Sequence, residues 1–244
     1  MANTIGYGQG AVNNTNAWGQ GAKVGSSFSN LQSTEYDGVD DYVDCGQVTE
    51  IQNTNALSVS CWFNYDSINS SADGLVAKDD DSRIDGNWYV ALQSNQVRFL
   101  LKTANGQDAL NSTTLSSGTW YHTLCVWNGS TMSIYINGTL NNSISVSNAT
   151  GTLGAALPQD TVKIGKRLPT SSRYNGRIDE VAVWNSDQSS IASAIGSSPV
   201  DLSSYSPVSW WRFEGTGTTA TDSGSGGNDG TLTNGVTRST DVPT

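Results

Sequence analysis

Short runs in which apolar and other side chains alternate, each bounded by turn-forming residues, constrain the fold of this chain more than any other feature. In residues 57–64, Leu57, Val59, Cys61 and Phe63 alternate with serine, tryptophan and asparagine. Successive side chains of a β-strand point to opposite faces, so this spacing places the four apolar side chains together on one face. The run therefore predicts a strand that lies against a core on one side.

Similar signals continue along most of the chain from residue 35. We expect strands at residues 41–48, 57–64, 74–78, 87–93, 96–103, 120–128, 132–136, 161–165, 176–184 and 208–213, and one short helix at 189–195. Ser94 and Asn95 form a loop of hairpin length, and Asn137 and Gly138 form a second tight turn. Many short strands separated by turns predict an all-β fold.

Composition supports the same fold class. Only 14% of the residues are charged, whereas the chain contains eight Trp and nine Tyr. The surface must then be covered largely by Ser, Thr, Asn, Gln and Gly, which supply turn geometry and local hydrogen bonds. A length of 244 residues is typical of one large β-sandwich domain with an aromatic core.

The charge balance excludes two classes of partner. The formal net charge is −10 and the pI is near 4.3. An acidic domain repels phosphate backbones and anionic membranes, so we expect no nucleic-acid binding and no membrane insertion. The acid excess leaves two interpretations open: ordinary solubility, or carboxylates gathered around a divalent cation.

The chain has three cysteines, Cys45, Cys61 and Cys125. An odd number without C-x-x-C spacing argues against both a disulfide framework and a zinc site. Cys61 and Cys125 stand in strand signals and are expected to act as small core residues. The first residues have neither the basic start nor the apolar run of a signal peptide, and no segment approaches the length of a membrane span. The expected place of synthesis is a cytoplasm.

Residues 1–34 differ from the rest of the chain. The sequence YGQGA at 7–11 recurs as WGQGA at 18–22, each copy giving one aromatic ring followed by glycines. Such a segment cannot bury enough apolar surface to fold alone. We interpret it as an attachment arm, with folding back onto its own domain as the alternative.

Four ordered motifs, over roughly residues 35–196, resemble the laminin-G-like branch of the concanavalin A-like lectin/glucanase superfamily. They are YDGVDDYV at 36–43, WYHT at 120–123, IYING at 134–138 and YNGRIDEVAVW at 174–184. The resemblance implies a two-sheet antiparallel β-sandwich, a jelly roll, over residues 35–244. A fifth motif, WWRFE at 210–214, normally opens such a module but here follows it. We expect residues 205–244 to supply a terminal strand in a permuted arrangement, or else to begin a second module.

The N-terminal repeat also resembles the start of virion proteins of tailed phages. That resemblance implies a non-catalytic structural or adhesion protein located on the virion, attached to other virion proteins through residues 1–34, with a host glycan as a candidate ligand. The aromatic and glycine repeats suggest a homo-oligomer. The alternative is a free carbohydrate-binding lectin, or a fragment of a larger secreted surface protein.

An enzyme with this fold would need two carboxylates that flank a glycosidic bond. Asp179 and Glu180 are adjacent in a predicted strand, so alternation would place them on opposite faces. Asp79, Asp80 and Asp81 fall in a predicted loop, and His122, the single histidine, lies at a strand start where packing is the expected role. We therefore expect no catalytic residues.

Calcium is the one cofactor with support, because it binds six to eight oxygens from carboxylates, amides and carbonyls. The loop at 222–230 could surround such an ion, helped by acids on neighbouring strands, as relatives with this fold imply. The alternative is an ordinary turn. The candidate ligands are Asp37, Asp40, Asp179, Asp222, Asn228 and Asp229.

Sugar binding in the related fold uses loops at one edge of the sandwich or its concave face, where an aromatic ring stacks on the sugar. Trp88 and Tyr174 are the candidate stacking residues, with a place in the core as the alternative for each. The full set of candidate carbohydrate-binding residues is Asp79, Arg83, Trp88, Asn105, Arg173 and Tyr174.

Overall fold

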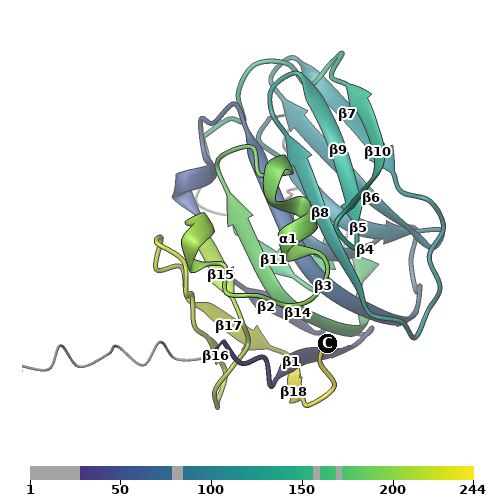
Figure 1. Cartoon of the computed structure of the whole chain (residues 1–244), viewed down its shortest axis with the longest axis vertical. Coiled ribbons are helices and arrows are strands. Elements are labelled where there is room, and N and C mark those ends of the chain that lie inside the picture. The colour runs from purple at the N-terminus through teal and green to yellow at the C-terminus, as the bar shows by residue number, and fades with distance from the viewer. Residues whose placement is uncertain (1–27, 79–84, 156–159, 169–171) are drawn as a thin grey trace, which may run out of the picture.

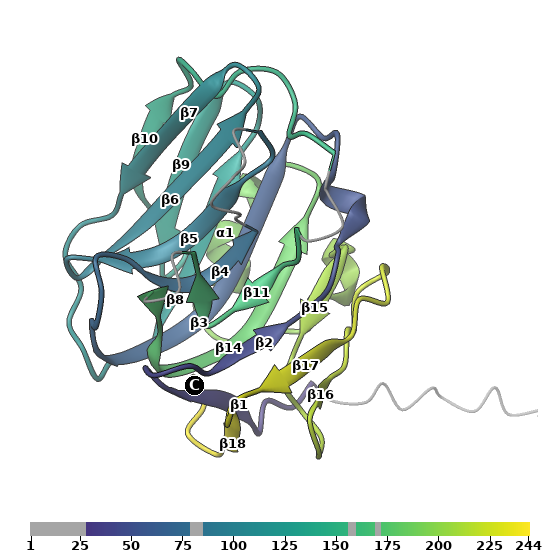
Figure 2. The same cartoon turned by 180° about the vertical axis from the view of Figure 1, so that it is seen from behind.

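The protein is a sandwich of two antiparallel β-sheets stacked face to face (Figure 1, Figure 2). The computed structural model describes residues 28–78, 85–155, 160–168 and 172–244. The predicted two-sheet antiparallel β-sandwich is therefore confirmed. No helix among these residues is long and apolar enough to cross a membrane.

Sheet A contains the longer strands and faces the viewer in Figure 1. Its spatial order is β10 (Thr139–Ser145), β9 (Thr131–Ile136), β8 (Tyr121–Trp127), β3 (Leu57–Ser67), β14 (Asn175–Trp184), β1 (Ser33–Asp37) and β18 (Thr237–Ser239). The short strand β15 (Ser209–Trp211) also pairs with β14, beyond the end of β1.

Sheet B faces the viewer in Figure 2. Its spatial order is β16 (Thr219–Ala220), β17 (Gly230–Thr233), β2 (Tyr42–Asp44), β11 (Lys163–Ile164), β4 (Asp73–Lys78), β5 (Trp88–Gln93), β6 (Gln96–Thr103) and β7 (Gly106–Asn111). A separate pair, β12 (Lys166–Arg167) and β13 (Ser172–Arg173), contacts β4. The helical turns are η1 (Thr49–Ile51), η2 (Ser189–Ile191), α1 (Ala192–Ile195) and η3 (Ser203–Tyr205).

The main core lies between the two sheets because the predicted alternation holds in both. Val59 and Phe63 of β3 face Val90 of β5 and Phe99 of β6 across this interior, and all four are 0% exposed. Cys61 and Cys125 belong to the same core, as expected, and Cys45 is buried there as well.

The outer face of sheet A is also covered. Trp184 and Trp210 pack there with Ile195 of α1 and Leu202. Figure 1 shows α1 lying across β8 and β14. This second apolar layer explains why residues 189–205 stay on the sheet: their few apolar side chains close a cluster that strand alternation alone would leave exposed.

Residues 205–244 complete both sheets instead of starting a new domain. They provide β15 and β18 to sheet A, and β16 and β17 to sheet B. The predicted strand at 208–213 corresponds to β15. Near the N-terminus, residues 28–34 of the predicted arm pack on the sandwich. Phe28 stacks on Trp210, and Ser33 and Thr34 belong to β1. Residues 1–27, with both glycine repeats, lie outside the described residues.

The predicted hairpin turns are confirmed by the backbone. Ser94 and Asn95 have φ of 51° and 61°, and Asn137 and Gly138 have φ of 47° and 77°. Two consecutive left-handed residues are what a tight two-residue hairpin requires, and asparagine and glycine adopt that conformation most readily.

Candidate functional site

The outer face of sheet B carries the first candidate site. Along β5, β6 and β7, the side chains that alternate with core residues point away from the other sheet. We call this set the amide–cation face: Tyr89, Ala91, Gln93, Gln96, Arg98, Leu100, Lys102, Gln107, Ala109 and Asn111. It contains no carboxylate, because Asp108 points to the opposite side of β7 and binds residues 147–149.

Tyr89 organises this face. Its hydroxyl accepts a hydrogen bond from Arg98 Nε at 3.3 Å, and the Arg167 guanidinium lies 4.2 Å from its ring centroid. Arg98 Nη1 donates to Asn111 Oδ1 at 3.2 Å, and Asn111 Nδ2 donates to Gln96 Oε1 at 3.3 Å. The planar polar groups are thereby held in fixed positions on the sheet, an arrangement suited to recognising hydroxyl and carboxylate oxygens.

The β12–β13 pair lies directly on sheet B beside this face. A Cβ atom added at Gly74 of β4 would come within 2.5 Å of the Lys166 carbonyl carbon, so only glycine permits the approach. Arg173 of β13 is 9% exposed, and its Nε and Nη1 atoms have no hydrogen-bond partner among the described residues. Donors buried without a partner are uncommon, so the Arg173 guanidinium is a candidate for binding an external acceptor.

The predicted sugar-binding residues do not gather at one place. Trp88 and Tyr174 are 0% and 1% exposed in the main core, so their rings cannot stack on a sugar in this conformation, and the core alternative describes them. Asn105 lies at the turn between β6 and β7, where its amide binds Thr150. Asp79 and Arg83 fall outside the described residues. Sequence reasoning missed Tyr89 and Arg98, although their outward positions follow from the alternation in β5 and β6.

A second candidate site is an acidic pocket of about 330 Å³ beside β1, β14 and β18. It is lined by Glu35, Tyr36, Asp37, Asp41, Asp66, Asn175, Gly235 and Thr237. Arg177 stands next to it and forms ion pairs with Glu35, Asp66 and Asp241 at 3.2, 3.7 and 3.4 Å.

Asp37, Asp40 and Asp41 bring carboxylate oxygens within 4.8 Å of one another at this pocket. Burial of Asp41 and the neighbouring charges of Asp37 and Asp40 raise the pKa of the Asp41 carboxyl. Asp41 is 3% exposed and its Oδ1 has no hydrogen-bond partner among the described residues. The spacing, the hard oxygen donors and the unpaired oxygen fit a calcium ion.

Gly235 keeps the approach to Asp41 open. Its φ is +124°, and a Cβ atom there would lie 3.0 Å from Asp41 Oδ1. Two of the predicted metal ligands, Asp37 and Asp40, thus lie together, and Asp41 is the third member that sequence reasoning omitted.

The remaining predicted metal ligands lie elsewhere. Asp222 accepts hydrogen bonds from the backbone N–H groups of Trp210, Gly224 and Asn228, and Asp229 accepts one from Asp222. These bonds close the 222–230 loop as a turn, the alternative considered from the sequence. Asp179 is 0% exposed within β14, and the metal-compatible group found among the described residues does not include it.

The expectation that Asp179 and Glu180 lie on opposite faces of their strand is wrong. Their strand contains a β-bulge between Asp179 and Ala182, and Glu180 has φ of 48°. A bulge inserts one extra residue and so shifts the alternation. Asp179 pairs with Trp62, and Glu180 lines a cavity with that residue, so both acids lie on the outer side of sheet A.

Both acids are buried, at 0% and 3% exposed. Glu180 accepts hydrogen bonds from Trp210 Nε1 at 2.6 Å and Arg212 Nε at 3.4 Å. Burial raises the pKa of Glu180 to about 7, against the lowering effect of Arg212 and Trp210. Burial and the Glu180 charge also raise the pKa of Asp179.

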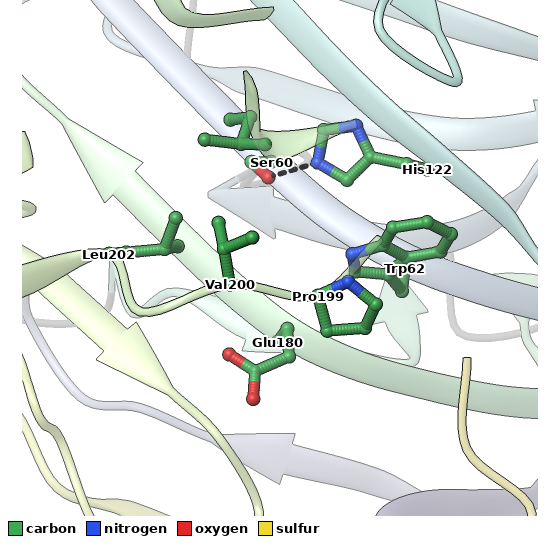
Figure 3. Close-up of a pocket in the computed structure, with 8 residues that line it drawn as sticks. Ser60, Trp62, His122, Glu180, Pro199, Val200 and Leu202 are labelled. Atoms are coloured by element: carbon green, nitrogen blue, oxygen red, sulfur yellow. Dashed lines mark hydrogen bonds between the residues drawn. The ribbon is translucent and has the colours of Figure 1, made fainter. Parts of the chain in front are cut away.

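His122 lies in the small cavity drawn in Figure 3, between β3, β8 and the segment that follows α1. Its Nε2 forms a 2.8 Å hydrogen bond with Ser60 Oγ, and its ring packs against Trp62 at 5.2 Å. Burial lowers the pKa of His122 to about 3, so the imidazole is neutral at pH 7. The cavity volume of about 10 Å³ is close to that of one water molecule and excludes a sugar ring.

Together, the twisted two-sheet sandwich, its outer-face layers and the polar face on sheet B define a lectin-like β-sandwich. The chain belongs to the concanavalin A-like lectin/glucanases superfamily, because the Laminin_G_3 family model matches residues 37–191. Comparison with curated proteins finds no matching sequence.

Solved structures with the same fold share little sequence with this chain. A Bacteroides ovatus protein described as a candidate carbohydrate-binding protein matches with a TM-score of 0.68 and 15% identity over 88% of this chain. This chain spans 62% of that protein's length. A second match is a carbohydrate-binding module of a Ruminococcus gnavus sialidase, bound to α2,3-sialyllactose. Its TM-score is 0.53 and its identity 12%, over 69% of this chain and 100% of the module. Domains LG4-5 of the mouse laminin α1 chain match with a TM-score of 0.51 and 15% identity. The match covers 67% of this chain and 45% of the laminin fragment.

Proposed function

We propose that this protein is a non-catalytic glycan-binding module, and that it binds through the amide–cation face of sheet B. The observation that carries the proposal is the fixed arrangement of Arg98, Asn111 and Gln96 around Tyr89. Amide and guanidinium groups held in place on a sheet can bind sugar hydroxyls without first losing side-chain freedom. Two structural relatives are described as carbohydrate-binding, which supports the same function.

The positions of the buried acids support a binding role over hydrolysis. A glycosidase needs two carboxylates that reach one bond from an open groove, about 5 Å apart or somewhat wider. Asp179 and Glu180 are covered by other side chains, and Glu180 is already bound to Trp210 and Arg212. The adjacent cavity has no room for a substrate.

A glycan array probed with the labelled protein tests the proposal. We expect selective binding by the wild type, and a loss of about tenfold or more in the double variant Gln107→Ala, Asn111→Ala, whose side chains lie on β7. Asn55→Ala, in the exposed loop before β3, is the matched control and should bind as the wild type does. The proposal fails if the folded wild type binds no glycan on a broad array.

We further propose that Asp37, Asp40 and Asp41 hold a calcium ion in the acidic pocket. A cation there would relieve the repulsion among three carboxylates and provide a partner for the buried Asp41 Oδ1. Such an ion would fix the loop between β1 and β2, which borders the pocket.

Display on the virion of a tailed phage is the more specific proposal. It rests on the repeated aromatic and glycine segment in residues 1–34, which predicts attachment to other virion proteins and an oligomeric assembly. Mass spectrometry of purified particles, comparing the full chain with a variant lacking residues 1–27, provides the test. Equal incorporation of both forms, or absence of both, would contradict attachment through this segment.

A further inference from the structure

Five of the ten described Lys and Arg residues of this acidic protein lie on the outer side of sheet B. The whole chain has 12 Lys and Arg against 22 Asp and Glu. Arg98 and Lys102 point outward from β6, and Lys163 pairs with the outward residues Asp44 and Ala77. Lys166 and Arg167 lie over the outward rings of Tyr42 and Tyr89 at 4.4 and 4.2 Å.

Neither Arg98 nor Lys102 forms an ion pair with a carboxylate of the described residues. Among the described residues whose side chains point outward from the strands of sheet B, Asp44 is the one acid. Asp73 and Asp108 belong to the same sheet but pair with the core residues Leu92 and Leu101, so they point the other way. On β5, β6 and β7 the outward side chains thus include two cations and no carboxylate, a distribution that attracts anions.

Arg98 is held in a position suited to an anion. Its Nε and Nη1 atoms are bound to Tyr89 and Asn111, and it forms no ion pair with any carboxylate of the described residues. The Arg98 side chain is half-buried, and its Nη2 atom remains for a ligand. A guanidinium fixed in this way can bind a carboxylate or a sulfate through charge-assisted hydrogen bonds.

Arg173 gives independent support from the neighbouring β12–β13 pair. Its side chain is 9% exposed, and two of its nitrogens lack a partner among the described residues. A buried guanidinium without an acceptor is unfavourable, and an anionic ligand would provide the missing acceptors.

The spacing of the cations indicates more than one anionic group in the ligand. Arg98 and Lys102 lie four residues apart on β6, which corresponds to about 13 Å along a strand. Two anionic groups on one oligosaccharide match that spacing better than a single carboxylate or sulfate does.

We propose that the amide–cation face binds an anionic oligosaccharide that carries at least two carboxylate or sulfate groups. Arg98 pairs with one group and Lys102 with another, while Asn111 and Gln107, their neighbours on β7, bind hydroxyls between the two groups. This inference rests on the proposed glycan-binding function and specifies its ligand class.

Isothermal titration with defined hexasaccharides tests the inference. The probes are a heparin hexasaccharide with sulfates and carboxylates, a hexagalacturonate with carboxylates only, and neutral maltohexaose. We expect the wild type to bind at least one acidic probe at least tenfold more tightly than the neutral probe, with affinity falling as NaCl rises from about 50 to 500 mM. The two acidic probes distinguish sulfate from carboxylate as the recognised group.

Arg98→Gln and Lys102→Gln should each weaken binding of the acidic probe by about 10- to 100-fold. Asn55→Asp changes the net charge by the same amount away from this face and should leave the affinity within about twofold. Arg98→Lys separates charge from geometry: partial recovery relative to Arg98→Gln is expected, because the charge remains and the fixed guanidinium is lost.

Two results would overturn the inference. If a neutral glycan binds as tightly as the acidic ones and Arg98→Gln has no effect, the ligand class is wrong while glycan binding stands. If the folded wild type binds no acidic oligosaccharide under low salt, the inference fails whatever the array shows for neutral glycans.

Discussion

The indole N–H of Trp210 donates a 2.6 Å hydrogen bond to the carboxylate of Glu180, which is 3% exposed. This contact joins the C-terminal part of the chain to the bulge of β14. It is reinforced from the N-terminal side, where Phe28 stacks on Trp210 at 6.3 Å and Arg212 lies over both rings. A buried acid therefore connects three distant segments, and its titration should report on their packing.

Glu180 should make the protein more stable at mildly acidic pH than at pH 8. Its pKa is raised from 4.5 to about 7 in the folded state, so its contribution is fully present below pH 4.5 and is lost as the pH rises through 7. Relative to wild type, Glu180→Gln should gain about 3 kcal/mol between pH 4.5 and 8. Urea unfolding across this range measures the difference, and parallel curves for the two proteins would contradict the buried titration.

His122 should have the opposite effect. Burial lowers its pKa from 6.5 to about 3, so its contribution to stability is complete above pH 6.5 and declines as the pH falls towards 3. Between neutral pH and pH 5 the wild type should lose about 2 kcal/mol of stability through this group. His122→Gln, which retains a partner for Ser60, should show a smaller loss of stability between pH 7 and 5 than wild type. An unchanged acid dependence would indicate that the imidazole reaches water.

Asp108 should be essential for joining β7 to residues 147–149. It accepts hydrogen bonds from the backbone N–H groups of Ser147, Asn148 and Ala149, and these hold its pKa well below its usual range in spite of burial. We expect Asp108→Asn to lower the free energy of unfolding by about 2 to 3 kcal/mol at pH 7. The wild-type contribution should fade below about pH 4, where the unfolded carboxyl becomes protonated.

The exposed Asp201 provides the control for Asp108, because it accepts a single backbone hydrogen bond from Ser203. Asp201→Asn should cost less than about 1 kcal/mol. Equal losses in the two variants would show that charge removal, and not the hydrogen-bonded loop, determines the result.

Gly176 should tolerate no side chain. Its φ is +135°, and a Cβ atom would lie 2.2 Å from the Asn64 carbonyl oxygen of β3. Gly176→Ala should therefore destabilise the fold by about 3 kcal/mol or more, since both backbones must move. Gly118→Ala is the control, with φ of +71° and open space around it, and should cost about 1 kcal/mol. Similar unfolding midpoints for the two variants would contradict the close approach.

Calcium should raise the unfolding temperature if Asp37, Asp40 and Asp41 bind it. We expect about 2 to 3 kcal/mol of stabilisation at 100-fold excess over Kd, reversed by a chelator. Asp41→Asn should abolish the calcium effect, whereas Asp66→Asn, a pocket residue outside the three-acid group, should retain most of it. If the wild type has the same unfolding temperature with calcium as with a chelator, the proposed calcium site is wrong.

Strand positions were predictable where the alternation of apolar and polar residues is strong. Residues 96–103 form β6 as predicted, and the strand at 57–64 continues to Ser67 as β3. The sequence did not predict several strands at or near the edges of the two sheets, namely β1, β7, β10, β16, β17 and β18, nor the two-residue strands β12 and β13. Such strands exist because a neighbour supplies their hydrogen bonds, and their own side chains carry little pattern.

The candidate sites were predictable only in part, because they depend on which strands become neighbours. Asp37 and Asp40 were identified as metal ligands from one local motif, but Asp222 and Asp179 belong to other surroundings. The amide–cation face draws on three strands, and its members are ordinary polar residues when read one at a time.

The sequence by itself determined that this chain forms short antiparallel strands with one or both faces buried, since alternation and turn residues act over only a few positions. Tertiary structure alone decided that Asp179 and Glu180 share a buried side of sheet A and that Arg98 meets Tyr89 and Asn111. The physical reason is that a single extra residue in a bulge reverses every later side-chain direction. Contacts between strands, moreover, depend on the sheet order, which no local pattern specifies.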